Sequence, residues 1–232
     1  MVSELGLLDG LTASLIILSS TTFGLLSLYK SIKMKAKLLT IAAMTMFFVG
    51  CFWLGPTIDF FMEVIWQTNI TPIHFYALLS YLWVAPALLF SMLLGGELLF
   101  PKKKWIIVGI YLILGIVFEY FLWFQTYESF IFTPPSSPGD LIDASFVRTH
   151  PTFLLVAFFL VSVLVFLGIG FAIKAKQSTG QLRRKFIYLS IGFTIFVICG
   201  ALDSILTIPV AIGVVRVVMA TFAGFMYLGL KT

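Results

Sequence analysis

The chain has 232 residues, of which 60% are hydrophobic and 11% are charged, and its formal net charge is +5. A soluble domain could not bury this much apolar surface, and the apolar residues form long runs that match the ~30 Å hydrocarbon core of a bilayer. These runs do not alternate as barrel strands do, so they predict helices. We therefore expect a single all-α integral membrane domain over residues 1–232. We assign the positive charge to membrane topology and expect no nucleic-acid partner.

The apolar runs predict a bundle of seven transmembrane helices. In chain order they lie at about 10–29, 37–57, 72–95, 104–125, 150–173, 185–204 and 208–230. The N-terminal stretch carries Glu4 and Asp9 but no Lys or Arg, so it lacks the basic region of a cleavable signal peptide, and the first helix should be retained. Asp203 and Pro209 mark a tight turn between the last two helices, because proline is tolerated only in a helix's first turn.

The cations predict the orientation of the bundle. Thirteen of the fifteen Lys and Arg residues fall in alternate connections or at the C-terminus: Lys30, Lys33, Lys35, Lys37, Lys102, Lys103, Lys104, Lys174, Lys176, Arg183, Arg184, Lys185 and Lys231. Cytoplasmic loops carry such an excess of positive charge. The sequence therefore predicts a multi-pass cell-membrane protein with its N-terminus outside and its C-terminus inside.

Two of the predicted outer segments are longer than the basic inner loops. They span Asp59 to Thr71 and Thr126 to Thr149 and are rich in Pro, Ser, Gly and aromatic residues. The stretch Thr133 to Asp140 has too much Pro, Ser and Gly for a regular helix or strand. The second of these loops is therefore either a turn-rich cap or a floppy connector.

Charged residues inside the hydrocarbon region are costly and normally face the bundle interior or a water-filled cavity. Glu119 and Arg216 lie within predicted helices, in the outer half of the membrane. Asp203, Asp59 and Glu63 lie at or just beyond the same depth, so these five residues form the candidate site. We expect Arg216 to contact Glu119 or Asp203, with Asp59 and Glu63 as second choices. The cluster either neutralises its own charges and locks the helices, or it binds a ligand or an ion.

No catalytic, metal-binding or cofactor motif accompanies these charges. His74 and His150 lack metal-ligand spacing and are expected at the membrane interface, while Cys51 and Cys199 form no CxxC motif and are expected to act as small apolar side chains. The last helix has no internal lysine for a retinal Schiff base, since Lys231 lies at its very end. We therefore expect no enzymatic activity, no metal and no cofactor.

Three short motifs carry a resemblance to a known family. They are Leu79-Ser80-Tyr81-Leu82-Trp83-Val84-Ala85-Pro86, Leu182-Arg183-Arg184-Lys185 and Phe222-Ala223-Gly224-Phe225-Met226-Tyr227-Leu228-Gly229-Leu230-Lys231. With these motifs, the chain resembles the N-terminal seven-transmembrane sensor region of prokaryotic histidine kinases and diguanylate cyclases. The resemblance implies a sensor, but the chain ends one residue after Lys231, so no output domain is expected.

These observations favour a sensor-like or ligand-binding membrane protein with a polar vestibule facing outward. Its expected partners are membrane lipids, a cytoplasmic or membrane signalling protein, and a small ligand from the outer side. A small transporter, channel or lipid-handling protein is the main alternative, although the inner half lacks the polar path that transport usually needs. A third alternative is an accessory subunit of a larger membrane complex.

Overall fold

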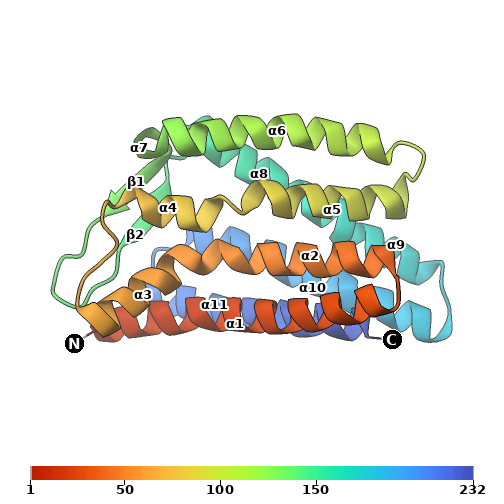
Figure 1. Ribbon diagram of the computed structural model, residues 1–232, viewed down its shortest axis with the longest axis horizontal. Coiled ribbons are helices and arrows are strands. Elements are labelled where there is room, and N and C mark those ends of the chain that lie inside the picture. Colours follow the sequence, from red (N-terminus) through yellow and green to blue (C-terminus); the bar gives the residue numbers. More distant parts are fainter. Residues whose placement is uncertain (1, 232) are drawn as a thin grey trace.

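The computed structural model describes residues 2–231, which contain seven helical spans long and apolar enough to cross a membrane (Figure 1). The spans are Glu4–Lys33, Lys37–Trp66, His74–Leu99, Lys104–Phe124, Pro151–Lys176, Gly180–Ile205 and Pro209–Leu230. The chain is therefore an all-α bundle of the multi-pass membrane class, as the sequence predicts.

Four of the spans are single helices and three are interrupted. The single helices are α1 (Glu4–Lys33), α6 (Lys104–Phe124), α10 (Gly180–Ile205) and α11 (Pro209–Leu230). The second span comprises α2 (Lys37–Gly50), a 3-10 turn η1 (Cys51–Trp53) and α3 (Leu54–Trp66), and the third comprises α4 (His74–Tyr81) and α5 (Val84–Leu99). The fifth comprises α8 (Pro151–Val163), a π-helical segment η2 (Leu164–Ile169) and α9 (Gly170–Lys176).

Two of the interruptions have a visible chemical basis. Pro86 lies in the first turn of α5, where it has no N–H to donate to the Leu82 carbonyl and its ring excludes that carbonyl, so the third span breaks just before it. In the fifth span, the Ser190 hydroxyl of α10 donates a hydrogen bond of 2.7 Å to the Gly168 carbonyl in η2. This bond gives the Gly168 carbonyl a partner in a segment where the regular α-helical hydrogen bonds between residues i and i+4 are lost.

The observed helix boundaries differ from the predicted ones at the end of the bundle where the chain begins. The first helix starts at Glu4, so Asp9 belongs to it. The second span continues to Trp66, so Asp59 and Glu63 lie in α3 and not in a loop as predicted. The reason is that α3 packs against both α1 and α4, and this burial supports helix beyond the hydrocarbon thickness. The turn between the last two helices is confirmed at Leu206 to Ile208.

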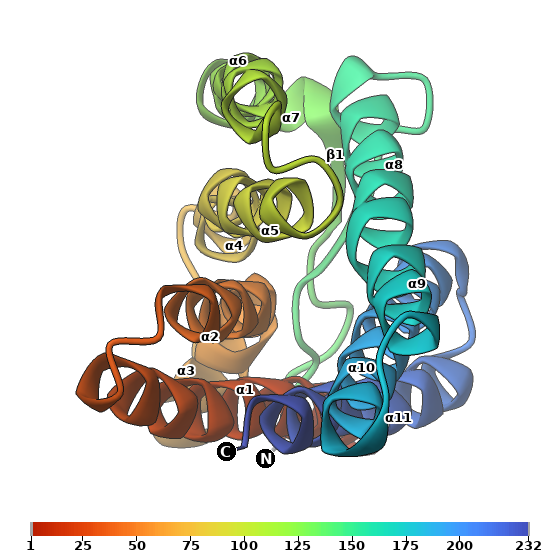
Figure 2. The same cartoon turned by 90° about the vertical axis from the view of Figure 1, so that its right-hand side faces the viewer.

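The spans form a ring in which neighbours in sequence are neighbours in space (Figure 2). Going round it, α6 is followed by α4 and α5, then by α2 and α3, then by α1. Helix α11 packs on both α1 and α10, and α8 and α9 complete the ring next to α10. The first and last helices therefore lie side by side and run in the same direction (Figure 1).

The long connection after α6 folds into a cap. It contains α7 (Thr126–Ser129) and an antiparallel hairpin of β1 (Phe130–Thr133) and β2 (Asp143–Phe146). Its tip is tied to the N-terminal segment by a hydrogen bond of 2.8 Å from Ser3 N–H to the Gly139 carbonyl. The connection is thus a structured cap, and the prediction that Thr133 lies outside regular structure is wrong, because it pairs with Asp143.

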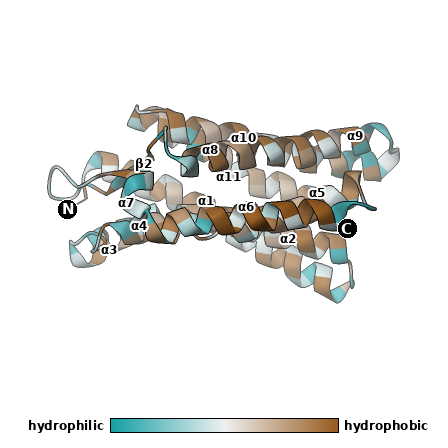
Figure 3. Cartoon of the chain, turned by 90° about the horizontal axis from the view of Figure 1, so that it is seen from above, coloured by the Kyte–Doolittle hydropathy of each residue, from teal (hydrophilic) through white to brown (hydrophobic). Residues whose placement is uncertain are grey.

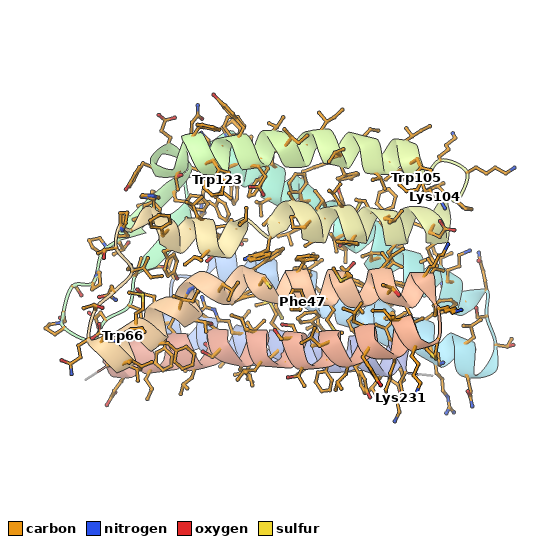
Figure 4. The ribbon with its side chains drawn as sticks, in the orientation of Figure 1. Phe47, Trp66, Lys104, Trp105, Trp123 and Lys231 are labelled. Carbon is orange, nitrogen blue, oxygen red and sulfur yellow. The ribbon has the colours of Figure 1, made fainter. Side chains whose placement is uncertain are left out.

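The two ends of the bundle differ in charge, and polar residues gather at both ends (Figure 3). We call the end that carries α7, β1 and β2 the hairpin end, and the opposite end the lysine end. The basic connections 30–37, 102–104 and 174–185 all lie at the lysine end, where Lys104 is seen beside Trp105 and Lys231 lies at the opposite edge of the bundle (Figure 4). Trp66 and Trp123 mark the hairpin end (Figure 4).

Gly55 permits the close approach of α3 to α4, which positions the hairpin end of the second and third spans. A Cβ atom there would lie 2.4 Å from the Tyr76 carbonyl oxygen. We expect Gly55→Ala to force the two helices apart and to lower the free energy of unfolding by about 1–3 kcal/mol. Thermal unfolding of the purified protein in detergent would measure this loss.

Gly109→Ala provides the matched control, since a Cβ atom at Gly109 in α6 meets nothing within 4 Å. The control should be neutral, or more stable by up to about 1 kcal/mol, because alanine favours helix. Equal unfolding midpoints for the two variants would contradict the tight α3–α4 contact.

Candidate functional site

A cavity of about 810 Å³ lies beneath the hairpin, inside the ring of helices. Its walls come from α1, α2, η1, α3, α4, α5, the hairpin, α8, α10 and α11. From Tyr76 near its mouth to Ser91 at its floor, the third span rises by roughly 20 Å. The cavity therefore penetrates well into the bundle from the hairpin end.

The floor of the cavity is apolar, and the bundle below it is tightly packed. The lining at this depth comprises Val49, Ala87, Leu88, Ser91, Phe159, Val163 and Phe196. Beyond it, toward the lysine end, Met46, Met92, Leu167 and Met226 are fully buried. The cavity lining thus ends in a hydrophobic layer before it reaches the lysine end.

Arg216 binds two carboxylates in the wall of the cavity. Its Nε atom donates a hydrogen bond of 2.8 Å to Asp203 Oδ1, and its Nη1 atom pairs with Asp9 Oδ1. Asp203 lies in the last turn of α10 and Arg216 about two turns into α11, so the tight turn at Pro209 brings them to the same depth. The side chain of Arg216 is only 11% exposed, so two carboxylates neutralise a buried charge.

Of the two partners predicted for Arg216, the structure brings only Asp203 to it. Glu119 lies on α6, across the ring from α11 (Figure 2). Both of its carboxylate oxygens are buried, and within residues 2–231 neither has a hydrogen-bond partner. The predicted Arg216–Glu119 contact is therefore wrong, because ring order places α1 and α10 beside α11 and leaves α6 on the far side.

Asp59 and Glu63 serve the cap and do not contact Arg216. Asp59 is completely buried and accepts hydrogen bonds of 2.8 Å from the backbone N–H groups of Ile70 and Ile142. It also accepts a bond of 3.2 Å from the Asn69 side-chain amide. Glu63 borders a separate polar recess between α3 and the hairpin tip. The prediction that Asp59 and Glu63 are second-choice partners of Arg216 is therefore wrong. Both residues lie in α3, where they face the hairpin.

Two tyrosines from α4 line the cavity near the ion cluster. Tyr76 is 6% exposed, and its hydroxyl has no hydrogen-bond partner among the described residues. The ring of Tyr81 packs on Phe130 and Phe146 of the hairpin, with centroid separations of 4.9 and 4.8 Å. The hairpin and α4 thus hold one aromatic wall in place.

Two aspartates of the cap also line the cavity. The pKa of the Asp143 carboxyl is raised by partial desolvation and by the nearby Asp9 carboxylate, while Arg216 acts in the opposite direction. Asp143 is nevertheless exposed, so solvent limits the size of this shift. The pKa of Asp140 is lowered by hydrogen bonds from Ser3 and Ser136. The two carboxylates therefore differ: Asp140 is engaged by the cap, while Asp143 forms no ion pair within residues 2–231.

Sequence reasoning missed Asp9, Asp143, Tyr76 and Tyr81 as site residues. At the level of sequence, Asp9 serves only to describe the N-terminal stretch, and Asp143 is not singled out. The signal for Asp9 was its place at the start of an apolar run, which becomes visible once the helix is extended back to Glu4. Asp143 left no signal of this kind, because only the folded hairpin brings it over the bundle, and the two tyrosines lie in a predicted apolar helix in which nothing in the sequence marks them as cavity residues.

The histidines and cysteines take structural positions. His150 caps α8 by accepting a hydrogen bond from Thr152 N–H, and His74 lies 3.1 Å from the Tyr127 hydroxyl. Cys51 and Cys199 are both buried and free. Within the described chain, no group of three or more His, Cys, Asp or Glu residues could hold a metal ion.

Comparison with known proteins adds no relative: a scan against protein-family models, a search of curated proteins and a search of solved structures each return no match. The cavity and its lining are therefore the features of this chain that bear on its function.

The two buried charges should respond differently to mutation. Arg216→Met leaves Asp9 and Asp203 without a counter-charge, so we expect it to lower the free energy of unfolding by about 3–5 kcal/mol. Glu119→Gln is the matched control, because it removes a buried carboxylate that has no partner, and it should be neutral or stabilising. Thermal unfolding of both variants in the same detergent would test this. An equal loss in both would contradict the assigned pairing.

Proposed function

We propose that this chain is a sensor-like membrane protein that binds a small molecule in the cavity beneath the hairpin. The observation that carries the proposal is the cavity itself. Its 810 Å³ lies within the range of small-molecule sites, and it combines an apolar floor with a few polar groups at one end. A receptor needs a pocket that is open to one side and closed to the other, and the packed layer of Met46, Met92, Leu167 and Met226 supports that requirement.

The charge distribution supports an orientation in which the hairpin end faces outward. The lysine end carries the basic connections, and cytoplasmic loops are enriched in Lys and Arg. In this orientation the ligand enters from outside, and the lysine end contacts anionic lipids or an intracellular partner. A separate signalling protein then supplies the output, in line with the resemblance to sensor regions.

A small transporter is the second candidate, and the interrupted spans favour it. Transporters build their sites on broken helices, and here Phe52 and Trp53 of η1, Val84 at the start of α5 and Val163 before η2 all line the cavity. Transport would require the packed layer of Met46, Met92, Leu167 and Met226 to open, whereas ligand sensing would not.

Cysteine labelling tests the orientation. Ser137 at the hairpin tip and Lys103 at the lysine end are both exposed, and the native cysteines are buried. We expect Ser137→Cys to react with a membrane-impermeant thiol reagent in intact cells and Lys103→Cys to react only after permeabilisation. The unmodified chain provides the background. Reaction of both positions from the same side would refute the orientation.

A thermal-shift screen of the purified protein tests ligand binding. A panel of small aromatic and aliphatic compounds of all charge classes should include members that raise the unfolding temperature, because a ligand at 100 times its Kd stabilises the folded state by about 2.7 kcal/mol. Gly200→Phe should abolish the shift. Gly200 lines the cavity and a Cβ atom there meets only Leu160, at 3.9 Å, so a side chain can start at this position without a clash and its ring is expected to occupy cavity space.

Gly224→Phe is the matched control, since Gly224 does not line the cavity and a Cβ atom there meets nothing within 4 Å. This variant should keep the shift. The proposal fails if no compound stabilises the protein, or if stabilisation survives in Gly200→Phe.

A further inference from the structure

The charges that line the cavity are unequal in number. Four carboxylates, from Asp9, Asp140, Asp143 and Asp203, face two guanidinium groups, from Arg148 and Arg216. Arg148 is exposed, and Arg216 already binds two of the carboxylates. The lining is therefore negative overall.

Arg216 is poorly placed to attract an anion. Its Nε and Nη1 atoms are occupied by Asp203 and Asp9, and the two carboxylates outweigh its single positive charge. An anionic ligand brought to this guanidinium would lie beside both aspartates. At such short range, like charges repel strongly in a partly desolvated site.

Asp143, in contrast, is well placed to attract a cation. It lines the cavity, and no Lys or Arg of residues 2–231 pairs with it. The charged and titratable groups around it are Asp9 of α1, Asp203 of α10, Arg216 of α11, and Tyr76 and Tyr81 of α4. Three carboxylates, including Asp143, face one guanidinium here. This excess of negative charge favours a positively charged ligand.

The tyrosines add a second, independent indication of a ligand. Tyr76 is nine-tenths buried, lines the cavity and keeps an unpartnered hydroxyl close to Asp9, Arg216 and Asp143. Because the hydroxyl oxygen keeps some exposure to the cavity, a ligand or a water molecule there can bond to it. The electron-rich faces of tyrosine rings also attract organic cations.

The apolar floor defines the rest of the ligand. Phe159, Phe196 and Val163 lie deeper than the charged groups, so one molecule could place a cationic centre near Asp143 and an apolar body below it. From this geometry we propose that the cavity binds an organic monocation with an apolar body, its cationic centre held by Asp143 with Tyr76 and Tyr81. The proposal rests on the proposed function and specifies its ligand class.

Three probes with the same apolar body test the charge preference. They are 4-phenylbutyltrimethylammonium, the neutral 4-phenylbutanol and the anionic 4-phenylbutanesulfonate, with binding measured by calorimetry on the protein in uncharged detergent. We expect the ammonium probe to bind at least about tenfold more tightly than the other two. Gly200→Phe should abolish its binding.

Two variants locate the cationic centre. Asp143→Asn should weaken binding of the ammonium probe about tenfold and leave the neutral probe unchanged. Tyr76→Phe should weaken it less, because it keeps the ring and removes only the hydroxyl. Glu128→Gln is the matched control, since it removes an exposed carboxylate from the same end of the bundle that does not line the cavity, and it should leave binding unchanged.

The pH dependence gives a further readout, because the charge of the ammonium probe is permanent. Its binding should weaken as the pH falls through the pKa of Asp143. Since that pKa is raised, the loss should begin above the range in which an ordinary aspartate, of pKa about 3.9, takes up a proton. Asp143→Asn should flatten this part of the profile.

The outcomes separate this inference from the proposed function. Tighter binding of the neutral or anionic probe, lost in Gly200→Phe, would overturn the cation class and leave the ligand-binding function standing. Equal ammonium binding in Asp143→Asn and the wild-type chain would overturn the assigned centre. Failure of all three probes would overturn the cation proposal, and the proposed function would fall with it only if the wider thermal-shift panel also fails.

Discussion

The buried charge of Arg216 is the constraint on which the cavity's arrangement depends. A guanidinium inside an apolar bundle needs counter-charges, and Asp9 and Asp203 supply them from two other helices. The cluster therefore joins the first helix to the last two and closes the ring where its ends meet. This closure makes α1 and α11 adjacent and creates an interior that can be hollow at the hairpin end.

A second buried carboxylate organises the roof. Asp59 holds the backbone of Ile70 and Ile142, so one side chain of α3 fixes both the connection before α4 and the hairpin strand that carries Asp143. Tyr81 fixes the same hairpin from the other side by packing on Phe130 and Phe146. The positions of Asp143 and Tyr81 thus depend on Asp59 and Phe130, which do not line the cavity, as well as on the contact of Tyr81 with Phe146.

The parts that were predictable from the sequence are those that local chemistry determines. Long apolar runs and basic connections define the seven spans, and Pro209 separates the last two, because each of these signals acts within a few residues. The Arg216 partners required knowledge of ring order, which hydropathy does not encode: Asp203 was reachable across a short turn, while Asp9 is two hundred residues away in the chain. The hairpin was hidden for a similar reason, since its strands are only four residues each and depend on Asp59 and Tyr81 for support.

The interrupted spans connect the cavity to the rest of the bundle. Trp53, Val84 and Val163 line the cavity at or next to the points where the second, third and fifth spans leave regular α-helical geometry. Helices bend most easily at such points, because the hydrogen-bond ladder is already altered there. A molecule that fills the cavity would contact all three, whereas α6 contributes no residue to the lining. The helices that continue from the interruptions of the third and fifth spans, α5 and α9, reach the lysine end. Between the cavity and that end lies the packed layer of Met46, Met92, Leu167 and Met226, so the altered helix geometry is found where the cavity lies and the dense packing begins beyond it.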